Sequence, residues 1–246
     1  MKKLGLLTVV ALAASFNVAF AADITGTVTL KGTPPAEKEI TPLKDDAVCG
    51  KPYATMPMTH YYAVNASGGL ADTVVMLKGI SGKSTGATAA AFKVDQKNCL
   101  YSPQVFAVQT GQKISVKNSD QVLHNVHINP TAAANNLANN SPSQMPNASD
   151  IAMTFSKPET FMKFQCDVHT WMFAWVVIVD SPYYAVTDKD GKFTIKDVPA
   201  GKYTVTALHR KLSLVPNSSP AEYKGLEKEV DVTAGNAAAD FTLEVK

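Results

Sequence analysis

The sequence lacks several features that mark whole classes of protein. Over 246 residues it has no apolar run of the roughly 18 residues that a membrane-spanning helix needs, and no cluster of lysine and arginine residues. The first absence predicts a chain without a membrane span. The second argues against nucleic acid or an anionic membrane surface as a partner. A convincing helical period is also missing, which argues against a helical fold.

The amino-terminal residues have the pattern of a secretory signal. Two lysines after Met1 precede the short apolar stretch Leu4–Ala14, and the tripeptide Ala19–Ala21 follows. We expect cleavage after Ala21, which removes residues 1–21, and export of the mature protein to the periplasm. The count of basic residues then drops from 23 to 21, which equals the 21 acidic residues and leaves no net charge.

Cysteine is scarce as well, with 3 residues in the chain. One of them, Cys166, is followed by His169 and Met172 in the run FQCDVHTWM, with the spacing Cys-x2-His-x2-Met. Thiolate, imidazole and thioether are three of the four side chains that make a blue-copper electron-transfer site. The fourth is a histidine, which we expect to come from another strand.

A histidine-containing run precedes this triplet. The segment Asp120–Ile128 reads DQVLHNVHI. Together, LHNVHI and CDVHTWM resemble the copper-binding segments of the cupredoxins, amicyanin in particular, and the resemblance covers roughly residues 95–181. It implies one type 1 copper site with a strong thiolate ligand, two equatorial imidazoles and a weak axial thioether, from Cys166, His124, His169 and Met172.

His127 and Asn125 need separate roles. Side chains alternate between the two faces of a strand, so His124 and His127 point to opposite sides unless a bulge intervenes. The resemblance selects His124 as the ligand, and we expect His127 to bond to a neighbour. Asn125 resembles the residue that ties the two copper-bearing segments together in this family.

Three other chemistries fit the triplet less well. Structural zinc usually takes four Cys or His ligands without a thioether. A binuclear copper centre needs a second cysteine in the loop, where Asp167 and Val168 stand instead. A cysteine nucleophile with a histidine base would need an oxyanion donor and an orienting residue, and the neighbouring sequence shows neither. We therefore expect a protein that is not an enzyme and has no catalytic residues.

Cys49 and Cys99 remain once Cys166 is assigned to copper. Cysteines in an oxidising compartment pair unless something holds them, which favours a disulfide between these two. The alternative is two independent buried thiols.

Alternating apolar residues and turn residues dominate the chain and predict an all-β protein. In residues 91–182 the alternation places Phe164 and Cys166 on one inward face, and Trp175–Val179 has the pattern of a closing strand. The stretch Asn129–Asn147 is rich in Ala, Asn, Ser and Pro and predicts a long irregular loop. By the resemblance, this part is a cupredoxin Greek-key β-sandwich.

The C-terminal part resembles a second family. Thr187–Ile195 has an Asp-Gly pair within an alternating pattern and predicts a hairpin, and Val198–Gly201 predicts another turn. The run DGKFTIKDVPAGKYTVTAL resembles the carboxypeptidase regulatory-like domain. That resemblance implies a transthyretin-like β-sandwich, grouped with carbohydrate-binding-like folds.

Two strands of that second family lie far upstream in this chain. They are the Gly-x-Val strand at Gly26–Leu30 and the strand ending in Leu-Lys-Gly at Val74–Gly79. We therefore expect a sandwich split into residues 22–90 and 183–246, with the cupredoxin domain of residues 91–182 inserted between its halves. The alternative is two consecutive domains with an N-terminal extension.

Other residues have candidate roles. Met56, Met58 and His60 alternate, so in an extended segment they would face one side and could capture Cu(I), although such short motifs are usually accidental. Trp171 and Phe173 either fill the core or form an apolar surface around an exposed edge of His169.

Two more candidates lie in the C-terminal part. His209 closes a strand, and we expect it to pack or hydrogen-bond. Tyr183 and Tyr184 are aromatic residues that could hold a carbohydrate, but analogy between folds does not support a ligand by itself.

These patterns predict a periplasmic blue copper protein that carries single electrons between redox partners. The likeness to amicyanin implies a methylamine-utilisation type of role, beside a dehydrogenase and a c-type cytochrome. One alternative is a periplasmic copper storage or delivery protein. Another is a carbohydrate-binding module with a vestigial copper site.

Overall fold

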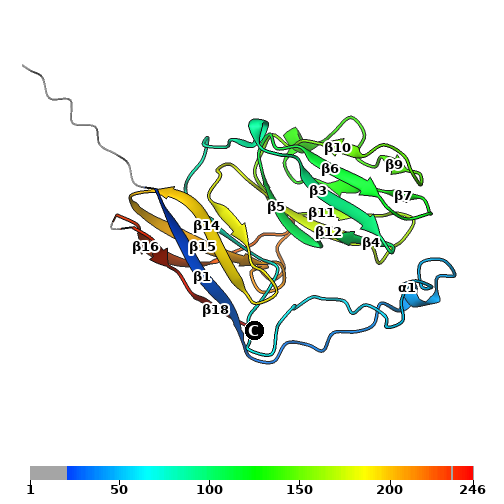
Figure 1. Ribbon diagram of the computed structural model, residues 1–246, viewed down its shortest axis with the longest axis horizontal. Helices are drawn as coiled ribbons and strands as arrows, with labels where there is room; N and C mark the ends of the chain where they lie inside the picture. The colour runs from blue at the N-terminus through cyan, green and yellow to red at the C-terminus, as the bar shows by residue number, and fades with distance from the viewer. Residues whose placement is uncertain (1–20, 234, 246) are drawn as a thin grey trace, which may run out of the picture.

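The computed structural model describes residues 21–233 and 235–245. The signal predicted for residues 1–21 therefore lies, apart from Ala21, outside the described residues. The one α-helix within them is α1 (Thr41–Asp45), and η1 (Gly86–Thr88) and η2 (Ala133–Asn135) are short 3-10 turns. None of these helices is long and apolar enough to cross a membrane. Strands make up the rest of the regular structure, so the all-β prediction is confirmed (Figure 1).

Residues 92–179 form one sandwich, with the sheet orders β10-β6-β3-β4 and β5-β12-β11-β8 and a small ribbon β7-β9. Inward side chains such as Phe106, Phe164 and Val176 fill a single apolar core, which also contains Cys166. The strands of this sandwich are β3 (Phe92–Lys97), β4 (Leu100–Ser102), β5 (Val105–Gln109), β6 (Ile114–Asn118), β7 (His124–Asn125), β8 (His127–Asn129), β9 (Ser143–Gln144), β10 (Ile151–Met153), β11 (Glu159–Gln165) and β12 (Phe173–Val179).

A second pair of sheets has the order β13-β2-β15-β16 and, facing it, β14-β1-β17 with β18 also paired to β1. A separate core, which includes Ile24, Val75 and Val205, lies in this pair. Strands from before and after residues 92–179 therefore pair with one another. They are β1 (Ala21–Lys31), β2 (Thr73–Leu77), β13 (Tyr184–Val186), β14 (Lys192–Pro199), β15 (Lys202–His209), β16 (Leu226–Asp231), β17 (Ala237–Ala238) and β18 (Phe241–Glu244).

The hairpin predicted for Thr187–Ile195 is wrong. The Asp-Gly turn is present, and Gly191 has a φ of 74°. However, β13 before it pairs with β2, whereas β14 after it pairs with β1 in the other sheet. The turn docks on β1, where Val28 N–H donates to the Gly191 carbonyl at 2.8 Å. An alternating pattern around Asp-Gly cannot distinguish a hairpin from such a crossing between sheets.

The two sandwiches pack against each other through an apolar interface. Val74 of β2 and Leu208 of β15 lie in one buried cluster with Ala107 of β5 and Val177 of β12. The chain enters and leaves the first sandwich at one place, because Lys83 N–H donates to the Asp180 carbonyl at 3.1 Å.

A long excursion between β1 and β2, residues 33–62, reaches along the first sandwich and returns; we call it the strap (Figure 1). Its two legs are joined where Ile40 N–H donates to the Pro57 carbonyl at 3.1 Å. A disulfide of 2.06 Å between Cys49 and Cys99 fastens the far end of the strap to the β3–β4 turn, as predicted. Ile40 and Leu43 are buried around it.

Candidate metal centre

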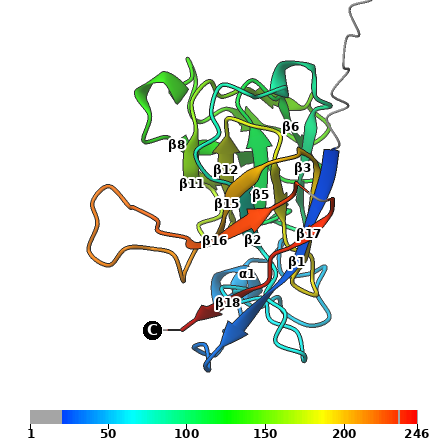
Figure 2. The same ribbon diagram turned by 90° about the vertical axis from the view of Figure 1, so that its left-hand side faces the viewer.

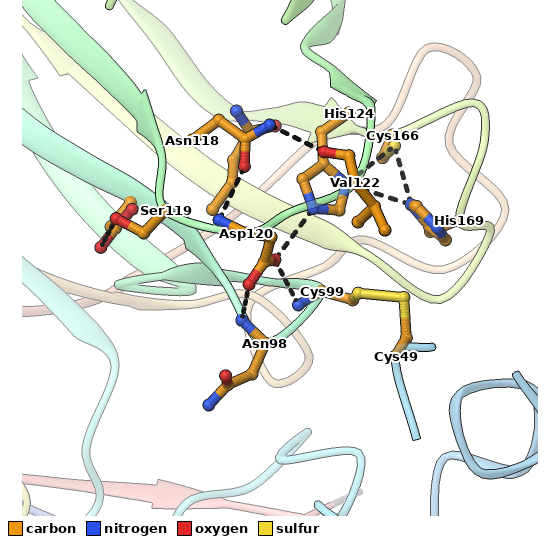
Figure 3. A network of polar contacts seen from close by, with 12 residues as sticks. Cys49, Asn98, Cys99, Asn118, Ser119, Asp120, Val122, His124, Cys166 and His169 are labelled. Carbon is orange, nitrogen blue, oxygen red and sulfur yellow. Dashed lines mark hydrogen bonds and ion pairs between the residues drawn. A yellow bond between two sulfur atoms is a disulfide. The ribbon is translucent and has the colours of Figure 1, made fainter. Parts of the chain in front are cut away.

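Three of the four predicted ligands meet at one end of the first sandwich. His124 lies in β7, and Cys166 and His169 lie in the loop between β11 and β12. The two Nδ1 atoms of His124 and His169 are 3.1 Å apart, and Cys166 Sγ is 3.9 Å and 3.6 Å from them respectively (Figure 3). All three side chains are buried, with His169 the most exposed at 7%. The arrangement is a small pocket of one sulfur and two nitrogens aimed at a common point.

The fourth predicted ligand, Met172, lies next to this group. The loop folds back on itself, because Met172 N–H donates to the His169 carbonyl at 2.8 Å and Cys166 N–H donates to the Met172 carbonyl at 3.0 Å. Met172 is fully buried and belongs to the same core as Cys166. The spacing Cys-x2-His-x2-Met thus closes a tight turn with Cys166 and Met172 at its two ends.

His127 lies outside this group, as predicted. It is partly exposed in β8, and its Nδ1 lies 2.8 Å from a carboxylate oxygen of Asp167. The bond to His127 is the largest influence on the Asp167 carboxyl and, with further hydrogen bonds, lowers its pKa to about 2.

Asn125 ties the two segments together, also as predicted. Its Oδ1 accepts from the backbone N–H of Asp167 at 2.7 Å, and its Nδ2 donates to the Asp167 carboxylate at 2.7 Å. The strand that carries His124 is therefore held in register with the loop that carries Cys166.

Asp120 is a site residue that sequence reasoning missed. Its carboxylate is 2.9 Å from His124 Nε2 and accepts the backbone N–H groups of Asn98 and Cys99 at 2.6 Å and 2.7 Å (Figure 3). Burial raises the pKa of Asp120, but these hydrogen bonds outweigh it and hold the pKa below its usual value. A carboxylate at Nε2 favours the proton there, which leaves Nδ1 free to bind a metal. The signal was a carboxylate four positions before His124, within the quoted run.

The surroundings favour an ionised thiol at Cys166. Burial raises the pKa of this thiol, but in the metal-free protein a bond from the His124 imidazole, when that ring is protonated on both nitrogens, and bonds from the backbone N–H groups of Asn125, His169 and Val168 bring it below its usual value. The pKa of the His169 imidazole is also lowered, by burial and by the neighbouring His124, and for an imidazole this favours the neutral form. A thiolate beside a neutral imidazole is the donor state that a soft metal ion needs.

A disulfide lies against His169, which sequence reasoning did not foresee. The sulfur atoms of Cys49 and Cys99 and a ring nitrogen of His169 lie within 4.8 Å of one another. Trp171 also lies against His169, because its Nε1 donates to the Cys99 carbonyl at 3.1 Å and its ring centroid is 5.2 Å from that of His169. The alternative of an exposed His169 edge framed by Trp171 and Phe173 is therefore wrong, since the strap occupies that place.

The remaining candidates lie elsewhere. His60 has a φ of 47°, so the segment with Met56 and Met58 is not extended throughout and the basis for a one-sided triplet is lost. His209 ends β15, is 2% exposed and stacks on Tyr62 with ring centroids 5.7 Å apart, which confirms a packing role. Burial lowers the pKa of His209 to about 4.

Tyr183 and Tyr184 do not form a surface pair of aromatic residues. Tyr183 packs against the core of the second sandwich, and Tyr184 packs into the interface between the sandwiches. This arrangement gives no support to a carbohydrate site.

Several solved structures resemble part of the chain. One is a copper-containing nitrite reductase from Thermus scotoductus SA-01, with 15% identity and a TM-score of 0.32 over 36% of this chain and 22% of that one. Another is a purple cupredoxin from Nitrosopumilus maritimus, with 17% identity and a TM-score of 0.29 over 35% of this chain and 98% of that one. A Cu(I) form of an amicyanin variant has 22% identity and a TM-score of 0.30 over 42% of this chain and 97% of that one.

The comparison of sequences gives a narrower result. No curated protein matches the chain significantly. Residues 88–179 match the family described as copper binding proteins, plastocyanin/azurin family. This range includes β3 to β12 and all four predicted ligands. The likeness to the plastocyanin/azurin family of copper binding proteins therefore covers the first sandwich, which is less than half of the chain and which we call the cupredoxin sandwich.

Proposed function

We propose that the protein is an exported blue copper protein that carries single electrons, with one type 1 site formed by His124, Cys166, His169 and Met172. The observation that carries this proposal is the buried group of one thiol and two imidazole Nδ1 atoms within 3.9 Å of one another. Met172, whose backbone is bonded to both Cys166 and His169, supplies the thioether. Thiolate, two imidazoles and a thioether are the donor set of a blue-copper site.

The residues around the site limit its rearrangement. Bound copper would supply a one-electron couple between Cu(II) and Cu(I). Asp120 fixes the ring of His124, and the Asn125–Asp167 bonds fix the loop that carries Cys166. Because these positions are set by the fold, the same geometry serves both oxidation states and little motion accompanies electron exchange.

A carrier fits this site better than an enzyme. His124, Cys166, His169 and Met172 are all buried, and the strap covers the side of His169. Among the described residues these four side chains are at most 7% exposed, which disfavours the approach of a substrate, whereas an electron can pass through packed side chains. We propose no catalytic residue.

The proposed setting is the periplasm, after cleavage behind Ala21. Redox proteins are the proposed partners, and the resemblance to amicyanin favours a c-type cytochrome or a dehydrogenase of the methylamine-utilisation type. The family match over residues 88–179 supports redox partners in general.

We also propose that the cupredoxin domain of residues 91–182 interrupts a carboxypeptidase regulatory-like sandwich made of residues 22–90 and 183–246. The pairing of β1 with β14 and of β2 with β15 supports this division. The contact between Lys83 and Asp180 places the two connections side by side, as an inserted domain requires.

The test of the function is the visible spectrum of protein loaded with Cu(II). A thiolate-bound type 1 site gives an intense band near ~600 nm, whereas copper bound adventitiously to imidazoles or carboxylates gives none. Reversible bleaching by one electron per protein would complete the case. A colourless protein with stoichiometric copper would overturn it.

A further inference from the structure

A cavity lies between the strap and the loop that carries His169. Its volume is about 570 Å³, within the range of roughly 300 to 1,000 Å³ that small-molecule sites occupy. Its walls include three aromatic side chains, Tyr61 from the strap and Trp171 and Phe173 from the loop and the start of β12. Such walls suit the two faces of an aromatic ring.

A narrower space continues from this cavity toward the second sandwich. The two share Thr59, Tyr61, Gln104 and Phe173 as lining residues, and the narrow part is also lined by Arg210 and Trp175. Its free volume is about 10 Å³, which is the room that one water-sized oxygen atom takes.

An unsatisfied donor and a cation line this narrow space. Trp175 Nε1 is buried without an acceptor among the described residues. The guanidinium carbon of Arg210 lies 4.8 Å from the centroid of the Trp175 ring and 5.2 Å from that of Tyr61. In the part of the chain that the structure describes, no carboxylate oxygen lies within the 4.0 Å of an ion pair with Arg210. A buried donor without an acceptor is costly, so the Trp175 N–H group, beside the guanidinium of Arg210, favours an oxygen atom at this place.

Three further ionisable groups lie near Arg210. Asp72 lines the same space, where burial raises the pKa of its carboxyl and the charges of His60 and Arg210 lower it. His209 is also there, and burial lowers the pKa of its imidazole to about 4, so it is neutral near pH 7. Lys211 adds a second cation nearby, with its Nζ 4.2 Å from the centroid of the Tyr61 ring. The guanidinium of Arg210 in the lining favours an electron-rich oxygen in the narrow space.

We propose that this cavity binds a phenol, with its ring between Tyr61, Trp171 and Phe173 and its oxygen accepting from Arg210 and Trp175. A phenol carries one oxygen on an aromatic ring, which fits a wide aromatic chamber that ends in room for one oxygen atom. A carboxylate would bring two oxygens to the same space. The site lies beyond the proposed copper function, but Trp171 links the two places because its ring also contacts His169.

The test uses the metal-free full chain and phenol as the probe. The chain has 2 tryptophans, Trp171 and Trp175, and both line the proposed site, so intrinsic fluorescence reports on it alone. Excitation at the red edge of indole absorption avoids the probe. We expect saturable binding below about 10 mM, confirmed by calorimetry, with toluene and benzoate at least about 10-fold weaker. Toluene leaves the donors unpaired, and benzoate does not fit the narrow end.

Two variants, each of which loses one positive charge, test the role of Arg210. Arg210→Met should weaken phenol binding by about 10-fold or more while leaving toluene unchanged, since it removes a donor and keeps an apolar stem. Lys202→Met removes an exposed cation at the start of β15 and should change the binding of neither phenol nor toluene. The proposal is wrong if phenol does not saturate, if phenol and toluene bind alike, or if Arg210→Met binds phenol like the wild type. If Arg210→Met fails to fold, the comparison of phenol with toluene on the wild type decides alone.

Discussion

The two sandwiches each consist of two facing sheets, but examples of their buried polar side chains differ in what they bond to. In the cupredoxin sandwich the buried imidazole of His124 bonds to another side chain, the carboxylate of Asp120. In the second sandwich, hydroxyl groups such as that of Thr187 bond to the backbone, where Thr187 Oγ1 donates to the Leu70 carbonyl at 2.8 Å. Side chains that bond to backbone hold a fold together, whereas side chains that bond to one another can hold a reacting centre. The comparison puts the proposed metal site in one sandwich and leaves the other as its scaffold.

The strap makes the two regions depend on each other. It belongs to the second sandwich by connectivity, because it joins β1 to β2, but it ends against His169 of the first. Figure 1 shows α1 of the strap far from the sheets of the second sandwich, and Figure 2 views the molecule from the side on which that sandwich lies. The scaffold therefore reaches the metal centre through one covalent bond, Cys49–Cys99, and a small apolar cluster.

The largest expected effect comes from separating the regions. A fragment of residues 183–246 would lose β1 and β2, which pair with β14, β13 and β15, and would expose unpaired edges and half a core. We expect it to be unfolded or aggregated, without dispersed amide signals in NMR spectra. A fragment of residues 82–181 retains every strand of the cupredoxin sandwich and should fold and bind copper. A cooperative melt of isolated 183–246 would instead favour consecutive domains.

The next effect concerns the metal centre itself. Cys166→Ser replaces the thiolate and should abolish the blue band entirely. Met172→Leu should keep the colour and shift the reduction potential, because the axial ligand affects the potential more than it affects the retention of copper. His127→Ala is the matched control, because His127 is bonded to Asp167 outside the group. Absorption spectra measure the blue band, and potentiometry measures the reduction potential. A blue Cys166→Ser protein, or a colourless His127→Ala protein, would contradict the ligand assignment.

The strap gives an intermediate effect. The disulfide closes a loop with a sequence separation of 50 residues, so replacing both Cys49 and Cys99 by Ala should lower the free energy of unfolding by about 2 to 4 kcal/mol. It should also speed alkylation of the Cys166 thiol in the metal-free protein, because that thiol is 2% exposed beneath the cover. Urea denaturation and the alkylation rate measure the two effects.

Lys44→Ala is the control for the strap. It removes the exposed ion pair with Glu39 and should change neither measurement. Equal alkylation rates in the double variant and the wild type would mean that the strap does not limit access to the centre.

The sequence predicted the parts of this design that depend on residue type and spacing. The Cys-x2-His-x2-Met turn, the register role of Asn125 and the outward position of His127 follow from local pattern and from resemblance. The disulfide followed from counting cysteines in an exported chain.

Other parts depend on contacts between distant segments, which the local pattern does not reveal even where the residue, such as Asp120, stands in the quoted run. Asp120 gains its role because the β3–β4 turn presents two N–H groups to it, from Asn98 and Cys99, both at positive φ. The strap covers His169 only because Cys49 lies across from that turn. The crossing at Gly191 was mistaken for a hairpin for the same reason, since the strand that receives it, β1, lies more than a hundred residues earlier.

The smallest effect tests whether Asp120 acts as a charged support for His124. Its folded pKa is below the unfolded value of 3.8, so its ionisation stabilises the folded protein above that value, and the stabilisation is lost as pH falls through the folded pKa. Asp120→Asn keeps the shape but removes the charge. We expect metal-free Asp120→Asn to lose about 1.5 to 3 kcal/mol at pH 7 and to show a flatter fall of stability below pH ~4 than the wild type. Urea denaturation across that pH range measures both, and Asp45→Asn, on the exposed side of α1, should leave the profile unchanged. The decisive outcome is the shape of the curve: if Asp120→Asn lowers stability equally at every pH, the carboxylate acts by size and hydrogen bonding alone, and its charge does not support His124.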